Sequence, residues 1–238
     1  MSHLANIFWR SLTGSHAHLG EGTDRIKRYV RGFPAMIGYA DPANPDFASL
    51  LPFCNAGERF YCSEWRGSEP AGWTIEVDTS MCAMLWQGTL PAPDTSLQIT
   101  RLGMEHVPQM LEIAAVTRPG PFPQRPLEMG EWYGVLEGDR VVAMAGERLY
   151  AAPLREVSGI CTLPEYQGRS YARRLTEQVI RSQLAHGLTP FLHVASANAR
   201  ARSLYERMGF VVEREVPMRV CFVRHRTDNG APEVQPAL

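Results

Sequence analysis

The segment from residue 156 to residue 187 constrains the fold most, because a strand, a glycine-containing loop and a helix follow one another there. Residues 156–162 predict a strand that stops at Pro164. Apolar residues at 172, 175, 179, 180 and 184 predict a helix over 171–185, with Gly187 placed as a left-handed C-terminal cap. A helix start leaves backbone N–H groups unpaired at the positive end of its dipole. The loop around Gly168 is therefore expected to bind an anion such as a pyrophosphate.

The elements on either side of this segment alternate between strand and helix patterns. Strands are expected at 97–102, 132–136, 141–148, 191–194 and 216–222, and a further helix is expected at 108–116. Another helix begins behind Asn198, a favoured N-cap, and ends at Gly209. The turn at 137–139 joins a hairpin. This order predicts a mixed α/β (α+β) fold in which helices cover a mixed sheet.

The first 87 residues carry fewer signals of fold and function. Short strands are expected at 60–66 and 81–87, which favours a smaller N-terminal α+β domain over 1–87 whose role is open. Residues 88–96 contain two prolines and few large apolar side chains, so a linker is expected there. Residues 227–238 are expected to form a flexible tail.

Composition excludes several classes of function. Lys and Arg number 24 against 25 Asp and Glu, so no basic face for nucleic acid is expected. No apolar stretch approaches the roughly 18 residues that span a membrane. The five cysteines form no Cys-x-x-Cys pair, and His16 and His18 lack a third ligand, so no metal site is expected and a cytoplasmic location is the default.

Two motifs resemble one known family. Gln167-Gly-Arg-Ser-Tyr-Ala172, preceded by Leu-Pro-Glu-Tyr, resembles the pyrophosphate signature of the GNAT acyl-CoA N-acyltransferases. The pattern from Asn198 to Phe210 resembles the second hallmark of that superfamily, at the expected distance downstream. The resemblance covers residues 97–224, defines an acyltransferase domain at 97–226, and looks closest to the glycine-N-acyltransferase-like branch. It implies a mostly antiparallel central sheet flanked by helices, with acetyl-CoA as co-substrate and no metal.

The resemblance also implies which residues bind coenzyme A. The pantetheine arm would pair with the backbone of the strand that ends before the loop, and the phosphates would bind to the loop and the helix start. The residues implied are Ile160, Cys161, Thr162, Gln167, Gly168, Arg169, Ser170, Tyr171, Ala172, Arg173 and Asn198. Ser170 departs from the family's usual glycine, so a positive φ there would be strained.

The same resemblance assigns catalytic roles. Tyr205 matches the tyrosine that protonates the departing thiolate. Glu156 lies where the histone-acetylating branch places its base, and partial burial on a strand is expected to raise the pKa of its carboxyl group. Glu147 is a second candidate for the base, and a water relay is a third route. The proline-rich loop at 117–126 is expected to close over the acceptor.

Each residue also has a purely structural interpretation. Tyr205 and His193 fit satisfied core side chains, and Cys161 fits a small buried residue. Glu156 fits an ion-pair partner for Arg148 or Arg155.

Two other functions remain open beside the acetyltransferase. One is a non-catalytic acyl-CoA sensor. The other is a serine hydrolase, because Gly168-x-Ser170-x-Ala172 also fits a nucleophile elbow. The acceptor is expected to be a primary amine of a small molecule or peptide. Its identity, the acyl-chain length and the oligomeric state, including a homodimer, are not determined by the sequence.

Overall fold

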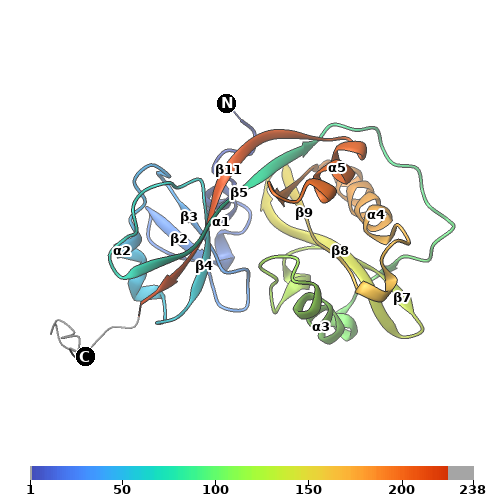
Figure 1. The fold of residues 1–238 in the computed structure, drawn as a ribbon, viewed down its shortest axis with the longest axis horizontal. Helices are drawn as coiled ribbons and strands as arrows, with labels where there is room; N and C mark the ends of the chain where they lie inside the picture. The colour runs from blue at the N-terminus through green and yellow to red at the C-terminus, as the bar shows by residue number, and fades with distance from the viewer. Residues whose placement is uncertain (1, 225–238) are drawn as a thin grey trace, which may run out of the picture.

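A single eleven-stranded sheet forms the frame of the molecule (Figure 1). The computed structural model describes residues 2–224, so the predicted tail and residues 225–226 of the predicted acyltransferase domain lie outside the described residues. The strand order is β1-β2-β3-β4-β11-β5-β10-β9-β8-β7-β6. Neighbouring strands are antiparallel except for the pairs β3–β4 and β9–β10. The predicted mixed, mostly antiparallel sheet flanked by helices is therefore confirmed.

The N-terminal half contributes five strands and two helices to this frame. They are α1 (Ile7–Thr13), β1 (Gly20–Gly22), β2 (Ile26–Tyr29), β3 (Met36–Tyr39), α2 (Phe47–Leu50), β4 (Arg59–Ser63) and β5 (Trp73–Trp86). The strand expected at 60–66 corresponds to β4. The strand expected at 81–87 is the second half of the much longer β5.

The C-terminal half has the order of elements that the sequence predicts. They are β6 (Thr100–Arg101), α3 (Val107–Thr117), β7 (Trp132–Glu137), β8 (Arg140–Ala151), β9 (Leu154–Thr162), α4 (Tyr171–Ala185), β10 (Thr189–Ala195), α5 (Ala199–Arg207) and β11 (Phe210–Val223). The sequence predicts this last strand only from residue 216, whereas β11 begins at Phe210. A register shift between Val212 and Arg214 interrupts the alternation of side chains in the part that was not predicted.

The sheet runs without a break between the two halves (Figure 1). β5 lies between β10 and β11, so Met81–Leu85 pair with the strand at Phe191–Ala195. β11 in turn pairs with β4 as well as with β5. The segment expected to be a linker, which forms no helix or strand, leaves the end of β5 and passes around the outside of α4 (Figure 1). Arg174 on α4 contacts Asp94 of this segment and donates to Ser96 at 2.6 Å.

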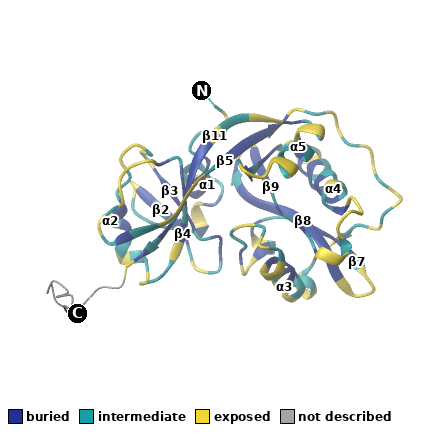
Figure 2. Cartoon of the chain, viewed as in Figure 1, coloured by how far each residue is buried: buried dark blue, intermediate teal, exposed yellow. Residues whose placement is uncertain are grey.

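Buried residues follow the central strands and the inner faces of the helices (Figure 2). On α4, Leu175, Val179 and Ile180 pack against the sheet, as the apolar spacing predicts. A second cluster combines Phe8 of α1 with Leu149 and Phe191 of the C-terminal half. None of the helices in residues 2–224 has both the length and the apolar character needed to cross a bilayer.

The two parallel strands β9 and β10 separate early. They pair over only three positions, from Leu154–Glu156 opposite Thr189–Phe191. Beyond that point the remaining halves of the two strands do not pair with each other. This opening in the sheet leaves backbone groups of β9 available, and the two cavities described next lie beside it.

Candidate active site

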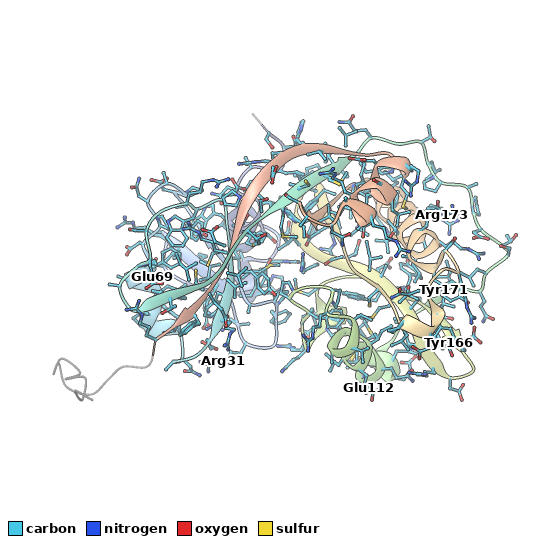
Figure 3. The ribbon with its side chains drawn as sticks, in the orientation of Figure 1. Arg31, Glu69, Glu112, Tyr166, Tyr171 and Arg173 are labelled. Atoms are coloured by element: carbon cyan, nitrogen blue, oxygen red, sulfur yellow. The ribbon has the colours of Figure 1, made fainter. Side chains whose placement is uncertain are left out.

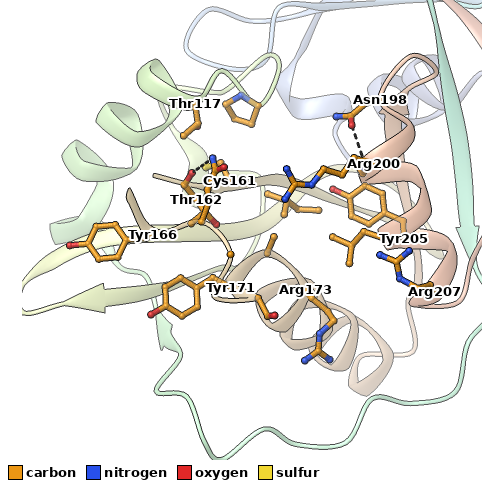
Figure 4. A pocket seen from close by; sticks show the side chains of 18 residues that line it. Thr117, Cys161, Thr162, Tyr166, Tyr171, Arg173, Asn198, Arg200, Tyr205 and Arg207 are labelled. Carbon is orange, nitrogen blue, oxygen red and sulfur yellow. Dashed lines mark hydrogen bonds between the residues drawn. The ribbon is translucent and has the colours of Figure 1, made fainter. Parts of the chain in front are cut away.

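The larger cavity, of about 680 Å³, lies between the end of β9, the start of α4 and the helix α5 (Figure 4). The side chains labelled on α5 face those at the end of β9 and the start of α4 (Figure 4). Every residue implied for coenzyme A lines this cavity except Arg169. The other lining residues are Thr117, Pro119, Tyr166, Arg200, Ala201, Leu204, Tyr205 and Arg207.

The loop before α4 presents its backbone N–H groups to this cavity. Gly168 and Ser170 both have positive φ, of 81° and 61°. Within residues 2–224, the N–H groups of residues 168–173 donate to no backbone or side-chain acceptor. Successive free N–H groups in such a conformation form an anion-binding nest at the helix start. Ser170 thus adopts a positive φ, at which a residue other than glycine is strained, and its conformation contributes to this nest.

Three arginines line this cavity. Arg173 projects from α4, while Arg200 and Arg207 project from α5 on the opposite side (Figure 4). Figure 3 places Tyr166, Tyr171 and Arg173 together on the C-terminal half, beside the start of α4. The sequence analysis missed Arg200 and Arg207, although their i, i+4, i+7 spacing with Leu204 places all three on one helical face. Arg169 instead lies 3.5 Å from Glu137 and stacks on the ring of Tyr166.

The end of β9 provides the opposite wall. Thr162 has a buried hydroxyl oxygen with no hydrogen-bond partner in residues 2–224, so a polar ligand would satisfy it. Burial raises the pKa of the Cys161 thiol to about 11, which keeps it protonated and unreactive. These features, together with the nest and the arginines, fit a ligand that has a pyrophosphate and an amide-containing arm.

A smaller cavity of about 130 Å³ adjoins the larger one. Pro119, Ile160 and Tyr205 line both cavities. The N-terminal half contributes side chains to its wall, and the proline-rich loop contributes residues 119–121. The remaining lining residues are Phe8, Met36, Tyr61, Met81, Arg148, Val157, Ser158, Gly159, His193 and Met218.

Tyr205 lies where the two cavities meet. Its side chain is largely buried, and its ring packs edge-on against Phe210 with centroids 6.0 Å apart. Burial raises the pKa of the Tyr205 hydroxyl to about 12. The phenol therefore holds its proton at neutral pH and is available as a proton donor.

Glu156 is fully buried and engaged on both oxygens. The Arg148 guanidinium donates to them at 2.8 and 2.9 Å, and the His193 Nδ1 lies 2.7 Å from Oε1. Burial alone would raise the pKa of this carboxyl group, but Arg148 and His193 outweigh it and hold the pKa well below its usual range. The expected raised pKa is therefore wrong, and the ion pair with Arg148 is confirmed.

Glu147 lies outside both cavities. It accepts from Arg155 and from Gln183, each at 3.0 Å, and so connects β8 with β9 and α4. This position gives Glu147 a structural role and no contact with either cavity. Within residues 2–224, the side chain of Ser170, which lies at the N-cap of α4, makes no capping hydrogen bond.

Both the sequence and the fold of the chain resemble those of known proteins. Residues 132–220 match the family model of the FR47-like proteins. A GNAT-family protein from Novosphingobium aromaticivorans is 32% identical, with 93% of this chain and 99% of that chain covered and a TM-score of 0.86.

More distant structures share the fold alone. A GCN5-related N-acetyltransferase from Kribbella flavida is 16% identical with a TM-score of 0.59, covering 94% of this chain and 96% of that one. A GCN5-related N-acetyltransferase-like protein from Streptococcus suis is 14% identical with a TM-score of 0.61, covering 90% and 92%. A search of curated protein sequences found no significant match. The identity to the Novosphingobium protein across nearly the whole of both chains establishes that this chain belongs to the GNAT family of acetyltransferases.

Proposed function

We propose that the protein transfers the acetyl group of acetyl-CoA to a primary amine by direct attack, with Tyr205 as general acid. The observation that carries this proposal is the position of Tyr205 in the walls of both cavities. A proton donor at such a junction can reach a sulfur in one cavity while an amine occupies the other. The N-terminal half, which lines the smaller cavity, shapes the acceptor side.

The residues of the larger cavity suit the binding of acetyl-CoA, which supplies the activated thioester carbonyl. The free N–H groups of residues 168–173 and the side chain of Arg173 bind its phosphates. Arg200 and Arg207 add positive charge from α5. Backbone groups of residues 160–162 orient the arm, because β9 leaves them unpaired with β10.

Ligand-dependent thermal stability tests the assignment of the co-substrate. Acetyl-CoA and free CoA at about 100 times the dissociation constant should each stabilise the protein by about 2.7 kcal/mol. ATP serves as a control for any nucleotide phosphate and should give a much smaller shift. Absence of a shift with both CoA species would refute the cofactor assignment.

Replacement of Tyr205 tests the chemistry. Tyr205→Phe removes the proton donor and leaves the ring, so thiol release should fall by about 100-fold or more while the Kd for acetyl-CoA stays within threefold. Tyr166→Phe is the matched control, since Tyr166 lines only the larger cavity, and its turnover should stay near that of the unmodified protein. Unchanged turnover in Tyr205→Phe would contradict the role. A protein that binds acetyl-CoA and acetylates no amine would be the sensor instead.

A further inference from the structure

His193 is the one imidazole that lines either cavity among the described residues. Its side chain is only 3% exposed, and its Nδ1 lies 2.7 Å from Oε1 of Glu156. Phe8 and Phe191 pack edge-on against the ring, with centroids 6.0 and 5.7 Å away. The ring is therefore fixed by one hydrogen bond and two aromatic contacts.

The bond to Glu156 determines which ring nitrogen is free. An ionised carboxylate only accepts hydrogen bonds, so Nδ1 carries the proton in this contact. Nε2 of a neutral imidazole then holds the lone pair. A carboxylate that fixes an imidazole in this way orients it as a base.

The two charged side chains next to the ring, Arg148 and Glu156, form an ion pair. Arg148 engages both oxygens of Glu156, so the carboxylate and guanidinium balance each other. Tyr61 from β4 and Tyr205 from α5 are the other titratable groups in the wall of the smaller cavity. Among the described residues, no Asp or Glu side chain lines that cavity.

Beside Arg148, Ser158 and the two tyrosines, the smaller cavity has an apolar part to its wall. Its wall includes one phenylalanine, three methionines and a valine, contributed by both halves of the chain. These are Phe8, Met36, Met81, Met218 and Val157. Methionine side chains adapt to apolar ligands of irregular shape. A second ammonium group in the acceptor would find no carboxylate partner here, and burying an unpaired charge is unfavourable.

From this juxtaposition we infer that His193 is the catalytic base, that Glu156 is its positioning residue, and that the acceptor is a small primary monoamine with an apolar substituent. The inference rests on the proposed function of acetyl transfer. It replaces a direct glutamate base, because both oxygens of Glu156 are already engaged.

The protons and bonds balance in the step that follows. The amine nitrogen forms a bond to the acetyl carbon as the bond from that carbon to sulfur breaks. His193 Nε2 accepts one proton from the amine nitrogen, and Tyr205 donates one proton to the departing sulfur. The imidazolium and the phenolate then exchange a proton with solvent, which restores both side chains.

His193→Asn is the decisive variant, because its amide nitrogen can keep the bond to Glu156 while the base is lost. Its kcat should fall by about 100-fold or more with the Kd for acetyl-CoA unchanged. The pH dependence of kcat/KM, measured with the same amine, should differ between the unmodified protein and this variant. His186→Asn removes an exposed imidazole outside both cavities and should change neither quantity.

The result also separates this inference from the proposed function. A His193→Asn enzyme that keeps the turnover or the pH dependence of the unmodified protein overturns the base assignment while acetyl transfer stands. Failure of the unmodified protein to bind acetyl-CoA or release thiol overturns the proposed function itself.

Glu156→Gln tests the positioning role. It should lower kcat less than His193→Asn does, with little effect on KM. If this variant does not fold, His193→Asn alone decides the assignment.

An amine panel tests the acceptor class. 2-Phenylethylamine should be acetylated with kcat/KM at least 10-fold above that for 1,4-diaminobutane, which carries a second ammonium. Met218→Glu, which places a carboxylate in the wall, should reduce this preference. Equal rates with both amines, or a preference for the diamine, would overturn the assignment of an apolar monoamine.

Discussion

Glu156 shows how a single buried residue can combine a structural and a functional role. Its carboxylate accepts from Arg148, contacts His193 and accepts from the backbone N–H of Leu149 at 3.3 Å. The ion pair joins two neighbouring strands, while the contact with His193 reaches the smaller cavity. The lowered pKa of its carboxyl group means that the ionised side chain stabilises the folded state, because protons bind more weakly there than in the unfolded state.

Acid should therefore destabilise the protein through this residue. The folded pKa of Glu156 lies below its unfolded value of about 4.3, so its contribution is fully present above that pH and is lost as pH falls toward the folded pKa. Glu156→Gln leaves Arg148 buried without its partner and should lower the free energy of unfolding by about 3–5 kcal/mol at pH 7. It should also flatten the dependence of that free energy on pH below about 4.3.

Urea unfolding at pH 7 and at pH 3.5 measures both effects. Glu165→Gln is the control, because Glu165 is exposed and lies 3.4 Å from Arg140. Its effect should stay within about 0.5 kcal/mol. Equal destabilisation by the two variants would show that burial of the Glu156 pair contributes nothing.

At the scale of elements, the turn between α5 and β11 fixes where the helix that carries Tyr205 lies. Gly209 has φ of 92°, and its carbonyl accepts from Gln87 at 2.8 Å. The indole N–H of Trp86 donates to the neighbouring carbonyl of Met208 at 3.0 Å. The end of β5 and the end of α5 are thereby held together at a point where two backbones approach closely.

An alanine at position 209 should disrupt this contact. Its Cβ would lie 2.6 Å from the Cα of Gly88, in addition to the strain of positive φ. Gly209→Ala should destabilise the protein by about 3 kcal/mol. Gly138→Ala also has positive φ but nothing within 4 Å, so it should cost only about 1 kcal/mol. Similar thermal midpoints for the two variants would contradict the close approach.

At the scale of the whole molecule, the two halves share both a sheet and a core. β5 and β11 run through both halves, and Phe8 packs in one cluster with Leu149 and Phe191. The smaller cavity is also built from both halves. Neither half of the chain encloses the proposed acceptor site alone.

The chain should accordingly unfold in one transition. Calorimetry should give a single peak whose calorimetric and van't Hoff enthalpies agree. Hydrogen exchange should report the same opening free energy at Ile26–Tyr29 as at Val179 and Ile180 on α4. Two peaks, or early exchange confined to the first half, would contradict a shared core and favour the separate N-terminal domain that the sequence predicts.

Local sequence patterns predicted the order of elements in the C-terminal half and the position of the loop before α4. Helix α4 has its predicted bounds, and the loop residues implied for coenzyme A line one cavity apart from Arg169. Such features depend on neighbours within a few residues, through side-chain spacing, capping and the φ preferences of glycine and proline. Such patterns can therefore be read from a short segment of the sequence without knowledge of the rest of the chain.

Contacts between distant parts of the chain account for the placement of β5, the pairing of Glu156 and the role inferred for His193. β5 lies between β10 and β11 although more than a hundred residues separate them, and strand pairing at such a distance has no local signature. The sequence predicted a raised pKa for the carboxyl group of Glu156 from burial alone. The structure shows that Arg148 and His193 outweigh burial and lower this pKa. The ring of His193 acquires its partner and its cavity only when strands from both halves come together, because an imidazole's chemistry is set by what surrounds it.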